Sequence, residues 1–304
     1  MKPLITKTVN LHDGFVPVEK LLQAQDQQSG SNLEALKRQA KQVAKICKGV
    51  LYRDDGVDAF GRPIFTPVAE NTVTLGGAIA ALERLTGKDA AFKPNTLNSI
   101  LNINDSGHTY DPLKTPIALF GCGIGGASMT FDEVYDPSPR QNNLAQLVPM
   151  MVAQDELTVT DADKYMMRSS IVTPNNTSLN CWYLKEFDVE PTIRSLWKDA
   201  PEENQDGTEI TADVADVEST NGVESFANFK LVLEDHDVRS YFEAMGQLSL
   251  ARINTIGLFM GEKVMVDDHP DYVNVRLFSV LNLNNEPLAE RKRIVYYYRI
   301  YALI

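Results

Sequence analysis

The sequence predicts an α+β protein that is mainly β: a helical N-terminal region followed by an antiparallel β-sandwich-like domain. Three observations predict this class. Apolar residues recur at helical spacing near the N-terminus, within residues 31–47. Beyond residue 113, apolar and polar residues alternate with a period of two in several segments. Between these parts, residues 95–116 are rich in Asn, Asp, Ser and Pro, which indicates a connector.

We therefore expect three regions: an extended N-terminal arm at residues 1–30, a helical or mixed region at 31–112, and a β-rich domain at 113–304. The arm alternates short apolar pairs with Gly, Pro and Gln, so we expect the surface against which it lies to order it. An insertion at 199–222 is rich in acidic residues and contains no Lys, Arg or aromatic residue. This composition predicts a solvated insertion between core strands.

Three helices are expected. The first begins at the capping box formed by Ser31 and Glu34, and Gly49 follows it as a left-handed C-terminal cap. The apolar stripe of this helix consists of Leu33, Leu36, Ala40, Val43, Ala44 and Cys47. A second helix spans residues 76–85 and ends at Gly87. A third, short helix begins at Asp237, which we expect to be its N-cap.

Strands are predicted where the period is two: at 165–172, 179–187, 226–234, 252–260, 272–283 and 294–303. In the last of these, one face carries Ile294, Tyr296, Tyr298, Ile300 and Ala302. The opposite face carries Arg293, Arg299 and Tyr301. Such alternation predicts an antiparallel sheet with one buried face, doubled into a sandwich.

Composition excludes several classes of function. The formal net charge of −12 disfavours nucleic-acid binding, because phosphate contacts need a basic surface. The three cysteines lie far apart and show no zinc-site or disulfide spacing. No stretch is apolar enough for a signal peptide or a membrane span, so we expect a protein that is made and kept in the cytoplasm, or in a particle assembled there.

The segment Gly121-Cys122-Gly123-Ile124-Gly125-Gly126 matches the dinucleotide pattern GxGxxG in form. That pattern binds a cofactor only when a helix begins at the glycines, and residues 127–131 do not resemble a helix start. We interpret the segment as a turn where the backbone passes close to another segment, and expect no cofactor.

Two groups of residues are candidates for other chemistry. Asp267, Asp268 and His269 could supply metal ligands, so a metal-dependent hydrolase with a dispersed site is one alternative. Trp182, Tyr183 and Trp197 could serve as stacking platforms in a carbohydrate-binding or receptor-binding β-module. The sequence contains neither a GxSxG motif nor a Cys with a supporting His pattern.

The order of segments in the second half resembles a module of tailed-bacteriophage virion proteins. A glycine turn at 120–126 precedes a strand reading Ile256-Gly257-Leu258-Phe259, then a strand carrying Arg276 and Phe278. A polar segment at 285–293 leads into a final strand with Tyr298-Arg299-Ile300. The resemblance covers residues 117–304. Thr255 stands where the module has an acidic residue, and the acidic insertion is additional.

This resemblance implies a structural virion protein of the neck, connector, tail or baseplate, present as a homo-oligomeric ring beside other virion proteins. Its mechanism would be interface formation, with no enzymatic activity. We expect Tyr296, Tyr298, Ile300 and Ile304 to pack in the sheet. We expect Arg299 and Tyr301 to face a neighbouring segment or subunit. We also expect the N-terminal arm and the final strand to reach across a subunit boundary, where strand addition would contribute main-chain hydrogen bonds.

Overall fold

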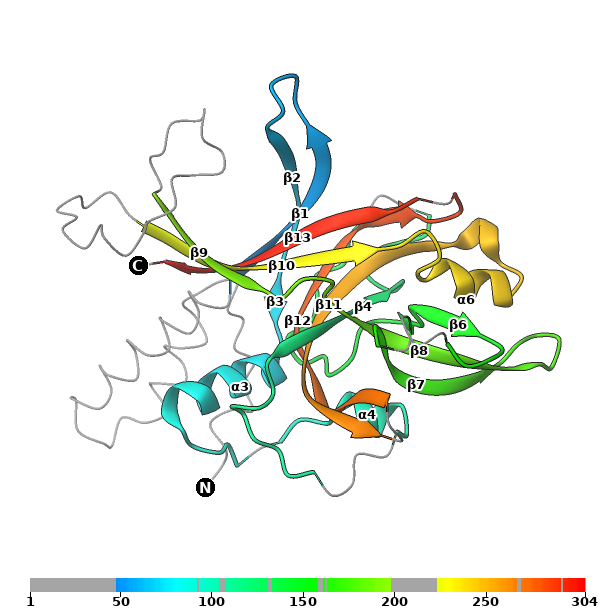
Figure 1. Ribbon diagram of the computed structural model, residues 1–304, viewed down its shortest axis with the longest axis horizontal. Helices are drawn as coiled ribbons and strands as arrows, with labels where there is room; N and C mark the ends of the chain where they lie inside the picture. The colour runs from blue at the N-terminus through cyan, green and yellow to red at the C-terminus, as the bar shows by residue number, and fades with distance from the viewer. Residues whose placement is uncertain are drawn as a thin grey trace.

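The computed structural model describes residues 48–91, 93–103, 108–130, 133–157, 161, 163–197, 223–266, 269–290 and 292–303. The expected arm, the expected helix at 31–47 and the acidic insertion at 199–222 lie outside the described residues. The described part consists mainly of antiparallel strands arranged in two sheets, so the expectation of a mainly β, sandwich-like protein is confirmed (Figure 1).

The first sheet has five strands in the order β2-β1-β13-β10-β9. They are β1 (Lys48–Val57), β2 (Pro63–Glu70), β9 (Thr192–Trp197), β10 (Val223–Leu233) and β13 (Ile294–Leu303). The central strand is β13, which pairs with β1 on one side and with β10 on the other. Tyr298, for example, lies between Leu51 and Phe229. Strands from opposite ends of the described chain therefore share this sheet.

The second sheet has the order β3-β12-β11-β4-β8-β6, with β5 paired to β4 and β7 paired to β8. Its long strands are β11 (Arg252–Val266) and β12 (His269–Pro287). The others are β3 (Thr72–Val73), β4 (Ile117–Gly123), β5 (Leu147–Val148), β6 (Met151–Ala153), β7 (Tyr165–Val172) and β8 (Ser178–Glu186). A bulge at Phe278 adds one residue to β12. The side chains after the bulge therefore point to the opposite face of the sheet from the one that the alternation before it would give them.

The helices lie at the periphery: α3 (Leu75–Thr86), α4 (Leu97–Ile100), α6 (Arg239–Ala244) and the 3-10 turn η3 (Leu248–Leu250). Thr74 caps α3, accepting a hydrogen bond from the N–H of Gly77, and Gly87 ends the helix with φ 61°. The predicted helix at 76–85 is thus confirmed. A Cβ on Gly77 would lie 2.1 Å from the carbonyl oxygen of Phe278, so this glycine lets α3 lie directly on β12.

Two apolar cores flank the second sheet. The core between the sheets includes Leu51, Phe229 and Tyr298 from the first sheet and Leu258 and Leu281 from the second. The other core, on the far face of the second sheet, contains Leu97, Leu119, Phe259, Val275, Leu277 and Val280, among other residues. The second sheet is buried on both faces, which corrects the expectation of one buried face and accounts for the nearly continuous apolar sequence of β11 and β12.

The strand predictions succeed where one face is buried and fail near the N-terminus. The structure has β7 and β13 at the predicted residues, and β8 and β10 within a few residues of them. Gly49 was expected to end a helix, but it lies within β1 opposite Ile300. Residues 48–70 form two strands that the mixed pattern did not predict, and they share a sheet with residues beyond 113.

A hydrogen bond joins the two sheets at the centre of the shared core. The hydroxyl groups of Tyr298 on β13 and Ser279 on β12 lie 2.7 Å apart, and both side chains are buried. Each hydroxyl therefore satisfies the other in a place that water does not reach.

Replacing Tyr298 by Phe should lower the free energy of unfolding by about 1–3 kcal/mol, because the buried hydroxyl of Ser279 loses its partner. Adding Ser279→Ala to Tyr298→Phe should recover part of this loss, since the buried hydroxyl that lost its partner is then removed as well. Denaturant unfolding checks both, with Tyr297→Phe on the outer face as the control expected to match the wild type. A double variant as unstable as the single one would contradict this account.

Candidate subunit interface

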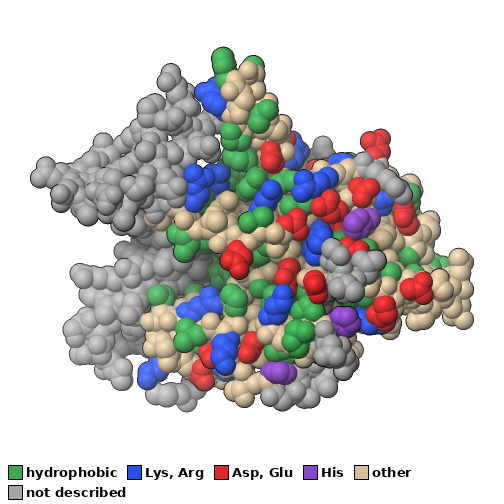
Figure 2. All heavy atoms as spheres, in the orientation of Figure 1, with side chains coloured by type: hydrophobic (Ala, Val, Ile, Leu, Met, Phe, Trp, Pro, Cys, Tyr) green, Lys and Arg blue, Asp and Glu red, His purple; other side chains and the backbone are tan. Residues whose placement is uncertain are grey.

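The hairpin of β1 and β2 projects away from the two sheets (blue in Figure 1). Its side chains near the turn have little to pack against: Val57 is 64% exposed and Phe60 is 84% exposed. In the space-filling view the hairpin ends in hydrophobic and basic side chains (Figure 2). A large aromatic side chain held in water at the end of a projecting element is a feature of protein-binding surfaces.

The carboxylate of Asp58 orders the turn of this hairpin. Its Oδ1 atom accepts hydrogen bonds from the N–H groups of Phe60 and Arg62 at 2.8 and 2.9 Å. Its Oδ2 atom accepts a hydrogen bond from Nε of Arg62 at 2.8 Å. These contacts, the backbone N–H of Arg62 first, lower the pKa of Asp58. The turn is therefore held in one conformation before any partner arrives, which reduces the entropy lost on binding.

An aromatic cluster around Arg299 attaches the hairpin to the first sheet. The guanidinium carbon of Arg299 lies 4.8, 5.2 and 4.9 Å from the ring centroids of Tyr52, Phe65 and Phe226. These rings come from β1, β2 and β10, so one cation contacts three strands on the outer face of the sheet. We call these four residues, together with Tyr301, the Arg299 cluster.

Tyr301 completes the cluster through its hydroxyl group, which lies 2.9 Å from the hydroxyl group of Tyr52. Burial raises the pKa of Tyr301 above its ordinary value, and the hydrogen bond with Tyr52 adds to this effect. Tyr301 therefore keeps its proton and can donate it within the pair. The neighbouring segments that Arg299 and Tyr301 face are strands of their own chain, and contact with another subunit stays a prediction.

The other predicted site residues that the structure describes lie inside the protein. Tyr296, Tyr298 and Ile300 are buried between the two sheets, as their alternation predicted. These three side chains therefore position the outer surface of the sheet and are not themselves part of it. Ile304 lies outside the described residues. The expectation that the final strand reaches a neighbouring subunit by strand addition is wrong, because β1 and β10 of the same chain occupy both edges of β13. The arm lies outside the described residues.

Among the described strands, β2 and β9 instead form the edges of the first sheet, at opposite ends of the strand order. In the described part of the chain, β9 pairs only with β10. Ile193 on β9 is 81% exposed, so this edge also presents an apolar side chain. An edge strand offers unpaired backbone groups to a partner, and β2 and β9 are the places where such pairing is possible.

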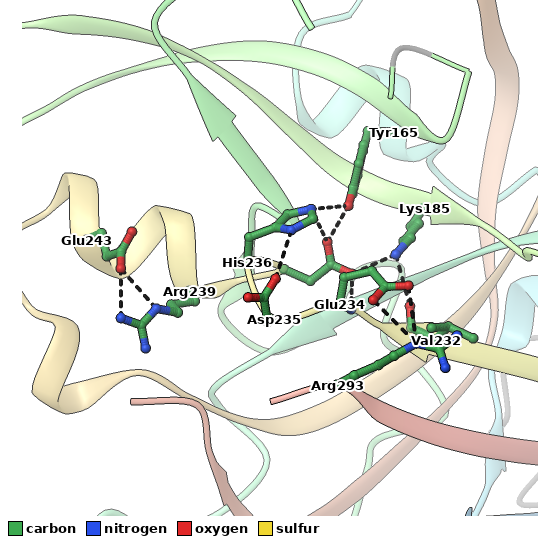
Figure 3. A network of polar contacts seen from close by, with 10 residues as sticks. Tyr165, Lys185, Val232, Glu234, Asp235, His236, Arg239, Glu243 and Arg293 are labelled. Carbon is green, nitrogen blue, oxygen red and sulfur yellow. Dashed lines mark hydrogen bonds and ion pairs between the residues drawn. The ribbon is translucent and has the colours of Figure 1, made fainter. Parts of the chain in front are cut away.

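A buried polar network lies at the end of β10, near α6 (Figure 3). Nζ of Lys185 lies 2.7 Å from Oδ2 of Asp237, and both side chains are almost completely inaccessible to solvent. Lys185 also donates to the carbonyl oxygen of Val232 at 3.0 Å. The hydroxyl of Tyr165 donates to Oδ1 of Asp237 at 2.5 Å and lies 2.9 Å from Nε2 of His236.

This network corrects the expectation that Asp237 caps the short helix. The N-cap of α6 is Val238, with φ 61° and no side-chain hydrogen bond. The carboxylate of Asp237 instead accepts hydrogen bonds from Lys185, from Tyr165 and from the N–H of Glu234. Burial, and then the negative charge of Asp237, raise the pKa of Tyr165, so its hydroxyl acts as a donor and not as a base. The network joins β7 and β8 to the end of β10.

Replacing Lys185 by Met should lower the free energy of unfolding by about 3–5 kcal/mol, because it leaves the carboxylate of Asp237 buried without its counter-charge. Combining Lys185→Met with Asp237→Leu should restore part of the loss, since no buried charge then remains. Chemical denaturation followed by circular dichroism measures both. Lys230→Met, on the outer face of β10, is the control. Equal stability of Lys185→Met and the wild type would show that the ion pair does not hold these strands.

The residues of the alternative functions are only partly described. Asp267 and Asp268 lie outside the described residues, and His269 is an exposed residue at the start of β12. Among the residues whose positions are described, no group of three or more His, Cys, Asp or Glu is placed to hold a metal ion. The metal-site alternative has no support from these positions.

The three stacking residues do not form one platform among the described side chains. Trp182 is 5% exposed, and the guanidinium carbon of Arg168 lies 5.7 Å from its ring centroid. Tyr183 is the next residue on β8, so it points to the opposite side of the sheet. The side chain of Trp197 lies outside the described part.

The glycine segment is explained by close packing. A Cβ on Gly125 would lie 2.8 Å from the Cβ of Ala145, and one on Gly126 would lie 2.4 Å from the carbonyl oxygen of Asn254. Gly126 also donates its N–H to the side chain of Asn254 at 2.7 Å. The predicted close approach to another segment is confirmed, and residues 127–130 form no helix. The segment is a turn only in part, because Gly121, Cys122 and Gly123 belong to strand β4.

Comparison with protein-family models, with curated proteins and with solved structures found no match to this chain. Within the described residues, no helix has the length and apolar character needed to cross a membrane.

Proposed function

We propose that this protein is a structural component of a tailed-bacteriophage virion, in the neck, connector, tail or baseplate, and that it assembles with copies of itself into a ring. The observation that supports this most is the projecting hairpin with its ordered turn and exposed Phe60. The guanidinium carbon of Arg62 lies 5.3 Å from the ring centroid of Phe60, but a single chain gains little packing energy from a side chain held so far in water. A partner that covers it would gain about 1.5–3 kcal/mol from burial of one aromatic side chain.

The arrangement of the first sheet suits head-to-tail assembly. The hairpin lies at one edge of this sheet and β9 lies at the other. A contact between two different surfaces of identical subunits forms a ring when the rotation between neighbours closes. In this proposal the hairpin of one subunit contacts the β9 edge of the next, near Ile193. The Arg299 cluster keeps the hairpin at a fixed angle, so every subunit repeats the same contact.

The partners in this proposal are neighbouring copies and adjacent virion proteins, and the protein is located in the virion after synthesis in the host cytoplasm. Its mechanism is the formation of interfaces and needs no cofactor. The buried network of Lys185 and Asp237 then has a structural purpose, because it stiffens the body from which the hairpin projects.

Replacing Phe60 by Asp should weaken subunit association by roughly 30-fold or more, as expected for the loss of a central aromatic anchor worth about 2 kcal/mol. The turn should keep its fold, because the contacts of Asp58 to the backbone do not involve the ring. Light scattering after size-exclusion chromatography gives the mass of the assembly over a range of concentrations. Thermal unfolding shows whether the subunit itself is intact.

Leu113→Asp is the matched control, because Leu113 is 79% exposed and belongs to a loop far along the chain from the hairpin. It should assemble like the wild type. Association of Phe60→Asp at wild-type strength would exclude the hairpin as the interface. A wild-type protein that stays monomeric at all concentrations, alone and with virion proteins, would contradict the structural role altogether.

A further inference from the structure

An apolar groove lies between α3 and the first sheet. Its volume is about 740 Å³. Side chains of α3 line one side of it, and side chains of β9, β10 and β13 line the other (Figure 1). Leu85 of α3 is 54% exposed and Ile193 of β9 is 81% exposed, although both line this groove. Exposed apolar side chains gathered around a concave surface are a feature of docking sites.

The described chain begins beside this groove. Lys48 pairs with Tyr301, and Gly49 pairs with Ile300, which lines the groove. The N–H of Gly49 also donates to the side chain of Asn71 at 2.7 Å, so the start of β1 is held in place. Three residues span at most about 10 Å. The segment that precedes residues 45–47 is therefore tethered close to the groove.

That segment carries an apolar stripe that needs a surface to cover it. Residues 33–44 belong to the helix that the sequence predicts, and the stripe within them consists of Leu33, Leu36, Ala40, Val43 and Ala44. A helix of this length is about 18 Å long and is marginal in water by itself, so its stability depends on packing of the apolar side. The groove offers an apolar surface within reach of the tether.

The charges of the segment and of the groove are complementary. The polar side of the segment is basic, with Lys37, Arg38 and Lys41 against the single acid Glu34. The rim of the groove is acidic where β8 ends, with Glu186, Asp188 and Glu190 in alternate positions. Of the two cations that line the groove, Lys263 lies 2.7 Å from Glu186, and Arg84 donates to backbone carbonyl oxygens of the connector before β4. Asp188 and Glu190 are exposed at this rim.

We propose that residues 33–44 bind in this groove of their own chain as an amphipathic helix, with the apolar stripe inward and the basic side toward the acidic rim. The short tether favours this occupant over a second copy. It holds the segment at an effective concentration on the order of millimolar, which a separate molecule does not reach at ordinary concentrations. Docking within one chain needs no neighbouring subunit, so the inference does not rest on the proposed assembly.

Hydrogen exchange of the full-length protein, read by mass spectrometry, tests the docking. Amides of residues 36–44 should exchange about tenfold or more slowly than those of an unstructured chain, because exchange requires the helix to leave the groove. Val43→Asp in the stripe and Leu85→Asp in the groove should each speed this exchange about tenfold, since each places a charge in the apolar contact. Amides of β11 and β12 should stay protected in both variants, which shows that the body is folded.

Each variant has a matched control. Gln42→Asp adds the same charge on the polar side of the segment. Val172→Asp adds it at an exposed position of β7 that pairs with Ser178, at the end of β8 away from Glu186. Both controls should exchange like the wild type.

Fast exchange of residues 36–44 in the wild type would overturn the proposal. Loss of protection in Val43→Asp but not in Leu85→Asp would place the stripe on another surface and overturn it as well. The measurement is repeated on dilution, with the mass of the protein followed by light scattering. Protection that disappears together with the assembly would place the segment in the groove of a neighbouring copy, against docking within one chain. Protection that persists in the monomer supports the proposal.

Discussion

The inward face of β13 is the constraint on which both sheets depend. Its side chains fill the core between the sheets, and the hydroxyl of Tyr298 meets that of Ser279 across this core. The outward face of the same strand carries Arg299, which holds the base of the hairpin. One strand with strict alternation thus fixes the distance between the sheets and the direction in which the hairpin projects.

Alternation made part of this fold predictable. The strands β7, β10 and β13 were identified from the sequence because one face of each strand is buried and the other is more polar. The hairpin of β1 and β2 was not predicted, for two reasons. Register shifts after Leu51 and Asp54 interrupt its alternation of apolar and polar residues, and much of it is exposed on both faces. The closely spaced Gly56, Asp58 and Gly61 were the available turn signal.

The sites were harder to predict than the strands, because they join distant residues. The partner of Asp237 is Lys185, 52 residues away, and nothing local distinguishes this carboxylate from an ordinary helix cap. For β13 the sequence indicated which side chains face inward, but not that the strand is central.

The central place of β13 has a consequence for the order of events during synthesis. Strand β1 leaves the ribosome early, yet its partner is made more than two hundred residues later, a delay of roughly 10–50 s at ordinary elongation rates. Until then Leu51 and the base of the hairpin lack the strand that covers them. A nascent chain released before residue 294 lacks the strand that joins β1 to β10. The first sheet can therefore close around β13 only after this strand has been translated.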